Sequence, residues 1–249
     1  MKLELNNRNA IIAGGSRGIG RAIALAFAEA GANVSICARG EAALRDTEAE
    51  LKRYGHTVHA ASCDLGDVDA VTNYINIAAK ALGGIDILVN NASGFGSKDD
   101  EESWARSINI DLLAAVRASR VAQPLLEQSR GVIINISSIS GLKPSARQPP
   151  YGAVKAAMMQ FTQSQAALLA GKGVRVNCIA PGSIEFPGGT WDLRKTSDPS
   201  LYQNTFKRIP FGRMGTPREI ANVALFLACD AASWVTGQTI AVDGGQMLS

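Results

Sequence analysis

The part of the sequence that decides the fold is a glycine-rich stretch near its beginning, Ala13-Gly14-Gly15-Ser16-Arg17-Gly18-Ile19-Gly20. Residues 9–13, which lead into this stretch, supply a short strand, and apolar residues recur at helical spacing in the helix that the glycines open, from Ile19 to Ala30. Strand, glycine turn and helix in this order predict a dinucleotide site. Glycines let the backbone approach a pyrophosphate, and the start of a helix offers free N–H groups. A tight β–α turn without further function is the alternative that this stretch alone leaves open.

Strand-like apolar runs alternate with helical patterns along the whole sequence. Besides 9–13, the runs typical of strands lie at 34–37, 57–61, 85–89, 132–136, 174–179 and 239–242. Helical patterns lie at 41–54, 68–82, 101–128, 151–170 and from 217 onward. This alternation predicts an α/β fold, a doubly wound Rossmann-type parallel sheet of seven strands with right-handed crossovers and helices on both faces. Because no linker divides the chain, we expect a single domain over residues 1–249.

A second motif combines Tyr151 with Lys155, four residues later, and with Ser138, thirteen residues earlier. Residues i and i+4 share one face of a helix, so the phenol and the ammonium would lie side by side. A neighbouring ammonium lowers the pKa of a phenol from its ordinary value of about 10, which suits acid–base catalysis near neutral pH. Ser138 follows the strand 132–136, and open α/β sheets bind their ligands at the carboxyl ends of strands. Taken alone, the pair is also compatible with an ordinary amphipathic helix.

Together with further motifs in the same order, these features resemble the short-chain dehydrogenase/reductase family over almost the whole chain. The motifs that match the family are Gly14, Gly18 and Gly20; Asn90-Asn91-Ala92; Asn109 for the catalytic asparagine; Ser138, Tyr151 and Lys155; Pro181-Gly182; and Val242-Asp243-Gly244-Gly245. Each motif is weak alone, but the combination and its order are specific to the family.

The resemblance implies hydride transfer between a nicotinamide and the carbon of a carbonyl or secondary alcohol. Tyr151 would exchange a proton with the substrate oxygen, and Ser138 would hydrogen-bond that oxygen while negative charge develops on it. Lys155 would hold the nicotinamide ribose and depress the tyrosine pKa. Asn109 would position a water that links Lys155 to solvent. The expected catalytic residues are therefore Asn109, Ser138, Tyr151 and Lys155, and no metal is expected.

NADP(H) is the expected cofactor. An acidic residue after the second strand would accept hydrogen bonds from a ribose 2′-OH and select NAD, but Ala38 stands there. Arg39 follows it and Arg17 lies in the glycine turn, and guanidinium groups suit a 2′-phosphate. By resemblance, the expected cofactor contacts are Gly14, Ser16, Arg17, Gly18, Ile19, Gly20, Arg39, Asp64, Leu65, Asn91, Ala92, Tyr151, Lys155, Pro181, Gly182 and Ile184.

The segment 183–213 interrupts the regular pattern and is rich in glycine, proline and aromatic residues. In the family that the chain resembles, this segment forms a flap that shapes the substrate pocket. Phe186 replaces a threonine that relatives often use to contact the cofactor, and Pro187-Gly188-Gly189 has the composition of a hinge. We expect the flap to close on an apolar carbonyl substrate and to be open or poorly ordered without one. A rigid surface loop is the alternative.

Composition argues against several other classes of protein. The net charge of +3 is too small to indicate nucleic acid or an anionic membrane as a partner. No run approaches the ~18 continuous apolar residues of a membrane span, and the first residues lack the apolar core of a signal peptide. The four cysteines are scattered without metal-ligand spacing, as in reduced cytosolic proteins. A cytoplasmic location is therefore expected.

The substrate stays open at this point. The pattern resembles the 3-oxoacyl-acyl-carrier-protein reductases, which implies reduction of a 3-oxoacyl thioester and an acyl carrier protein as a partner. Against this, Val132 stands where those enzymes often carry a basic residue that helps to dock the carrier. Alternatives are a dehydrogenase of a small alcohol, sugar, steroid or aromatic diol, and a non-catalytic regulator that senses NADP(H). Such regulators typically lose the tyrosine or the lysine, whereas this chain keeps both.

The family also implies assembly. Its members usually form tetramers through two surfaces, one on the long helices expected at 101–128 and 151–170, the other on the last strand and the helix near 219–229. We therefore expect a homotetramer of D2 symmetry.

Overall fold

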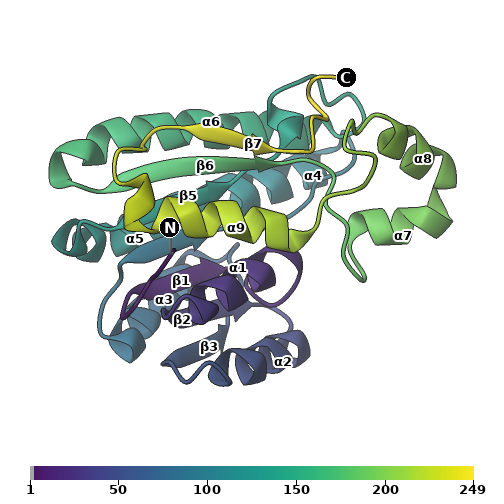
Figure 1. Cartoon of the computed structure of the whole chain (residues 1–249). Helices are drawn as coiled ribbons and strands as arrows, with labels where there is room; N and C mark the ends of the chain where they lie inside the picture. Colours follow the sequence, from purple (N-terminus) through teal and green to yellow (C-terminus); the bar gives the residue numbers. More distant parts are fainter. Residues whose placement is uncertain (1–2) are drawn as a thin grey trace.

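The computed structural model describes residues 3–249 and shows one parallel sheet in the order β3-β2-β1-β4-β5-β6-β7 (Figure 1). The strands are β1 (Asn9–Ala13), β2 (Asn33–Ala38), β3 (Val58–Ser62), β4 (Ile87–Asn90), β5 (Val132–Ile136), β6 (Arg175–Pro181) and β7 (Thr239–Val242). All neighbouring pairs are parallel. The seven-stranded, doubly wound α/β fold expected from the sequence is confirmed.

The α-helices between the strands are α1 (Gly18–Glu29), α2 (Glu41–Lys52), α3 (Val68–Leu82), α4 (Glu101–Arg106), α5 (Ala114–Ser129), α6 (Pro149–Leu169), α7 (Thr190–Ser197), α8 (Pro199–Lys207) and α9 (Pro217–Ala228). Short 3-10 turns are η2 (Ile139–Gly141), η3 (Ala170–Lys172) and η4 (Asp230–Ala232). A π-helical segment, η1 (Ser107–Leu113), joins α4 to α5.

The core consists of two apolar layers, one on each face of the sheet. Alternate residues of β1 divide between them: Ala10 and Ile12 pack with α1, α2 and α9, whereas Ile11 and Ala13 pack with α3, α5 and α6. Because both faces are covered, the central strands are apolar at nearly every position, as parallel sheets require. In Figure 1, α9 and α1 cross the near face of the sheet.

The order of the strands reverses between β1 and β4, which lie side by side although β2 and β3 intervene in the sequence. At such a switch point the connections leave in opposite directions and open a crevice at the carboxyl ends of the strands, where doubly wound sheets bind ligands. The glycine turn follows β1, and Asn91 follows β4. The fold therefore brings both motifs to the same crevice.

Two predicted elements differ in detail. The helix expected at 101–128 is divided by η1, in which one extra residue per turn rotates the side chains that follow it. The segment 183–213 contains two ordered helices, α7 and α8, which project beside the ends of the strands (Figure 1). Within the segment, Glu185 pairs with Lys195 at 2.6 Å and accepts a hydrogen bond from Tyr202 at 2.8 Å, and Asp198 pairs with Arg147 of the neighbouring loop at 3.4 Å. Closure of this flap stays a prediction.

Candidate active site

The glycine turn between β1 and α1 is a backbone cradle. Gly14 N and Gly15 N donate to the Cys37 carbonyl at 3.0 and 3.1 Å, which joins the turn to the end of β2. Gly14 has a φ of 78° and Gly18 a φ of 55°, in the left-handed region that favours glycine. No side-chain hydrogen bond caps α1 at its N-cap, Arg17. Its first N–H groups are thus left for a ligand, which in this setting fits an anion such as a pyrophosphate.

The turn also leaves no room for side chains. A Cβ added to Gly15 would lie 2.5 Å from Ile36 Cγ2, and one on Gly18 would lie 2.5 Å from the ring of Phe186. A Cβ on Gly20 would overlap the Gly14 carbonyl and the amide of Asn91. These close approaches, with the free helix start, are the observations that fit a dinucleotide cofactor. Phe186, on the flap, packs directly against this turn.

The other expected cofactor contacts lie around the same crevice. Asn91 Nδ2 donates to the Gly14 carbonyl at 2.8 Å, and Asp64 Oδ1 accepts from Gly66 N at 2.9 Å. Arg17 and Arg39 are exposed, as recognition of a phosphate would need. At the end of β6, Gly182 N donates to the Val242 carbonyl at 2.9 Å, which places 181–184 beside the carboxyl end of β7.

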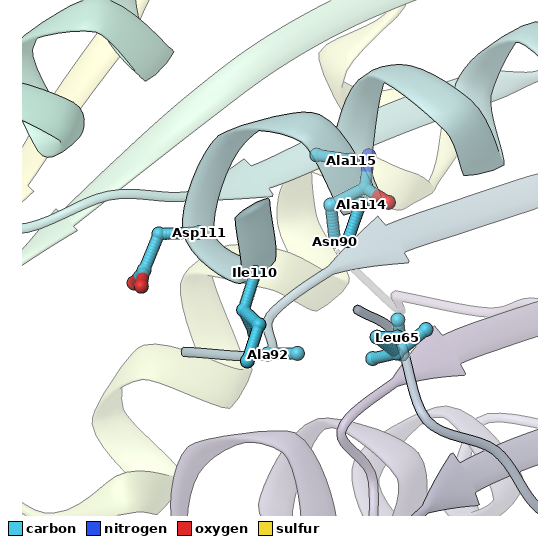
Figure 2. Close-up of a pocket in the computed structure, with 8 residues that line it drawn as sticks. Leu65, Asn90, Ala92, Ile110, Asp111, Ala114 and Ala115 are labelled. Carbon is cyan, nitrogen blue, oxygen red and sulfur yellow. The ribbon is translucent and has the colours of Figure 1, made fainter. Parts of the chain in front are cut away.

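A small hollow lies at the switch point, beside the carboxyl ends of β1 and β4. It is lined by Ala13, Leu65, Asn90, Ala92, Ile110, Asp111, Ala114 and Ala115. Two of the expected cofactor contacts, Leu65 and Ala92, belong to this lining. Figure 2 shows Leu65 and Ile110 at this hollow, whereas the carboxylate of Asp111 points away from Leu65.

Two of the four expected catalytic residues, Tyr151 and Lys155, lie side by side on α6. Lys155 Nζ lies 5.5 Å from the centre of the Tyr151 ring on the same face of α6, and the ring of Phe95 packs against Tyr151 with 5.0 Å between centres. Ser138 is the N-cap of the 3-10 turn η2 after β5, where its hydroxyl accepts from Ser140 N at 3.1 Å. Tyr151 is half-buried, whereas Lys155 is buried. The phenol is thus within reach of a ligand, and the ammonium lies behind it.

Lys155 has a charged partner that the sequence did not predict. Its Nζ donates to the Ile136 carbonyl at 3.1 Å and lies 3.0 Å from Asp111 Oδ1. Burial lowers the pKa of Lys155, but the Asp111 carboxylate, with smaller effects of Tyr151 and Cys178, raises it, and the net direction is upward. The other oxygen of Asp111 accepts from Gly94 N at 2.8 Å.

The side chain of Asn109 turns to the loop that follows β3, and its predicted role in positioning a water stays a prediction. Asn109 Nδ2 donates to the Gly66 carbonyl at 2.9 Å, and Asn109 Oδ1 accepts from Arg117 at 2.8 Å. It therefore supports the loop that follows β3, while Asp111, two residues later in η1, contacts Lys155. Asp111 could have been noticed in the sequence. It is an acid among Ile110, Leu112 and Leu113, and a buried carboxylate needs a cation.

Comparisons with known proteins agree with this geometry. The family profile described as "Enoyl-(Acyl carrier protein) reductase" matches residues 13–247. The chain belongs to the short-chain dehydrogenase/reductase family. It is therefore an oxidoreductase of this family, whose members use nicotinamide cofactors. It is 40% identical over 247 residues to 3-oxoacyl-[acyl-carrier-protein] reductase FabG of Chlamydia trachomatis, with 97% of this chain and 98% of that protein covered.

Solved structures of the family show both cofactors. A 7 alpha-hydroxysteroid dehydrogenase complexed with NADH and 7-oxo glycochenodeoxycholic acid is 34% identical, with a TM-score of 0.92 and 98% and 96% of the two chains covered. L-Sorbose reductase of Gluconobacter frateurii, complexed with NADPH and L-sorbose, is 31% identical, with a TM-score of 0.92 and 100% of both chains covered. The comparisons thus leave open which cofactor this chain prefers.

No helix within residues 3–249 has the length and apolarity to cross a membrane.

Proposed function

We propose that this protein reduces the carbonyl group of 3-oxoacyl thioesters with NADPH. The observation that supports the proposal is that Tyr151 and Lys155 lie side by side on α6, while Ser138 and the glycine cradle follow β5 and β1, whose carboxyl ends lie at the same edge of the parallel sheet. The similarity to 3-oxoacyl-[acyl-carrier-protein] reductases supports the thioester as substrate. An acyl carrier protein is the carrier that this similarity suggests for the thioester.

Preference for NADPH follows from the residues at the end of β2. Ala38 leaves this end without a carboxylate that could accept hydrogen bonds from a ribose 2′-OH. Arg17 and Arg39 are exposed and could bind a 2′-phosphate through paired N–H groups. We expect NADPH to bind at least about tenfold more tightly than NADH, a difference of about 1.4 kcal/mol.

The chain's own residues would supply binding and proton transfer. Bound NADPH would supply the hydride that adds to the carbonyl carbon. The Ser138 hydroxyl would donate a hydrogen bond to the carbonyl oxygen, and the Tyr151 phenol would donate the proton that converts this oxygen to a hydroxyl group. Overall, carbonyl, NADPH and one proton give the alcohol and NADP⁺. In the reverse direction the phenolate would remove the hydroxyl proton.

A panel of substrates tests the proposal. Purified protein with NADPH is mixed with acetoacetyl-CoA, acetoacetyl carrier protein, L-sorbose or a 7-oxo bile acid, and the loss of NADPH absorbance is followed. We expect the acetoacetyl thioesters to give the fastest reduction. Faster turnover of the sugar or the steroid would replace the thioester by one of the alternative substrates, and no turnover of any compound would favour a non-catalytic sensor.

The Tyr151→Phe variant identifies the proton donor in the same assay. Because only the hydroxyl group is removed, turnover should fall by about 10²–10⁴-fold while NADPH affinity stays nearly unchanged. Calorimetric titration with NADPH serves as the control for folding and cofactor binding. Wild-type turnover in this variant would refute the assignment of Tyr151.

A further inference from the structure

The ion pair between Asp111 and Lys155 is the most deeply buried charged contact of the site. The Asp111 side chain is 0% exposed and that of Lys155 is 2% exposed, with 3.0 Å between the charged atoms. The pair joins two elements that are distant in the sequence, because Asp111 belongs to η1 and Lys155 to α6. Asp111 also accepts from Gly94 N at 2.8 Å, which fastens the loop that follows β4.

The surroundings of Lys155 contain one carboxylate. In the described part of the chain, its ammonium faces Asp111 from η1, the Tyr151 ring from α6, the Cys178 thiol from β6 and the Ile136 carbonyl from β5. Burial disfavours a charged ammonium, and a carboxylate within hydrogen-bond distance opposes that effect. The thiol cannot take over this task, because burial raises the pKa of Cys178 and keeps it protonated.

We propose that Asp111 is a positioning residue whose carboxylate keeps Lys155 protonated and fixed beside Tyr151, and thereby sets the upper pH limit of carbonyl reduction. The proposal rests on the proposed function, because Tyr151 is taken as the proton donor. In this arrangement the Asp111 carboxylate and the Lys155 ammonium are both ionised, so the pair behind the Tyr151 phenol has no net charge. Asp111 acts through Lys155 and need not touch the substrate or the cofactor.

The direction of the effect follows from charge alone. Removal of a negative charge weakens proton binding by every group near it, so both the ammonium and the phenol would lose their protons at lower pH. The Asp111 carboxylate lies 3.0 Å from the Lys155 ammonium, and an opposite charge so close typically changes the pKa of a group by about 1–3 units. Reduction needs the protonated phenol, so its rate would begin to fall at lower pH. Since the pKa of Lys155 is raised in the folded protein, the stabilisation by the pair is present at neutral pH and is lost as pH rises through that pKa.

Asp111→Asn is the variant of choice, because it removes the charge and keeps the size of the side chain and an oxygen that can accept from Gly94. Asp111→Glu keeps the charge on a longer side chain. Glu101→Gln makes the same change of charge on the exposed surface of α4 and is the matched control. For each protein, kcat is measured with NADPH and acetoacetyl-CoA, or the best compound of the panel, as a function of pH.

A second measurement needs no substrate. The ultraviolet absorbance of the phenolate is recorded during a pH titration of each protein, and the same titration of its Tyr151→Phe derivative is subtracted. The difference reports the ionisation of Tyr151 alone. It can therefore be interpreted even if no compound of the panel is reduced, which separates failure of this inference from failure of the proposed function.

We expect Asp111→Asn to move the alkaline limb of kcat, and the midpoint of the phenolate difference, to lower pH by at least about one unit. Asp111→Glu should restore most of this shift, and Glu101→Gln should leave both curves in place. Midpoints in Asp111→Asn within about 0.3 unit of the wild type would overturn the proposal. A uniform loss of rate at all pH values would overturn it as well, because a merely structural role predicts that result.

If Asp111→Asn does not fold, the pair is tested by removing both charges. The double variant Asp111→Asn/Lys155→Met leaves no unpaired buried charge, so it should fold and recover most of the lost stability. Failure of the double variant to fold would contradict a role of Asp111 through Lys155. The pH profile of Asp111→Glu then tests whether the charge sets the upper pH limit. Because this variant keeps the charge, its alkaline limb should stay near the wild-type pH, and a limb moved away from it would contradict control by charge.

Discussion

Gly20 offers a direct test of the cofactor cradle, because replacement by alanine adds a single methyl group at its tightest point. Gly20 lies in the first turn of α1 and is buried. Its added Cβ would overlap the Gly14 carbonyl oxygen and Asn91 Nδ2, two atoms that are themselves joined by a 2.8 Å hydrogen bond. The carbonyl is backbone and cannot rotate away. We therefore expect Gly20→Ala to push α1 and the glycine turn apart.

The change in the stability of Gly20→Ala is the balance of two unfavourable effects and one favourable effect. Overpacking of a tight contact typically costs about 1–3 kcal/mol, and loss of the hydrogen bond between Asn91 and Gly14 costs about 0.5–1.5 kcal/mol. Alanine is a better helix former than glycine by about 1 kcal/mol, which offsets part of the loss. The free energy of unfolding should therefore fall by about 2 kcal/mol. For a chain of this size the melting temperature should fall by roughly 4–8 °C.

Chemical denaturation and calorimetric titration with NADPH measure both consequences. Gly171→Ala is the matched control, since a Cβ at Gly171, in η3, would meet nothing within 4 Å. We expect this control to stay within about 0.5 kcal/mol of the wild type. Gly20→Ala should also bind NADPH more weakly, because the displaced turn carries the expected pyrophosphate contacts. Wild-type stability together with wild-type NADPH affinity in Gly20→Ala would refute the close packing on which this reasoning depends.

Two further predictions concern cofactor choice and assembly. Arg39→Asp should reduce the preference for NADPH over NADH by at least about tenfold, because a carboxylate repels the 2′-phosphate and can accept a hydrogen bond from a 2′-OH. Calorimetric titrations with both cofactors measure this preference, and an unchanged value would argue against Arg39 as a cofactor contact. In the expected homotetramer, the exposed Leu168 and Trp234, 71% and 99% exposed in the single chain, should become covered by a neighbouring subunit. Trp234→Glu should then yield smaller species in light scattering, and a wild-type monomer at micromolar concentration would contradict the tetramer.

Most of the fold could be predicted from the sequence, because the signals that specify it are local. The central strands of this sheet are covered on both faces, so the run 132–136 is buried throughout and apolar except at Asn135, in contrast with the helical spacing that surrounds it. Glycine and proline mark the boundaries, as Pro149 does at the start of α6. The π-helical segment η1 has no comparable signal. Residues 101–128 keep a helical pattern throughout, and the extra residue per turn depends on packing against α6.

The active site was less predictable, for a reason that Asn109 and Asp111 show. The chemistry of Tyr151 and Lys155 depends on their spacing within one helix, which a sequence displays directly. The partner of Lys155 comes from another element, and which side chain of η1 faces α6 depends on the rotation of that segment. The residue type pointed to Asn109, whereas the rotation brings Asp111 to the ammonium and turns Asn109 to Gly66. A carboxylate in place of an amide adds a full negative charge beside Lys155. The pH range of catalysis is therefore a property that this family member would owe to Asp111 and that its shared motifs do not reveal.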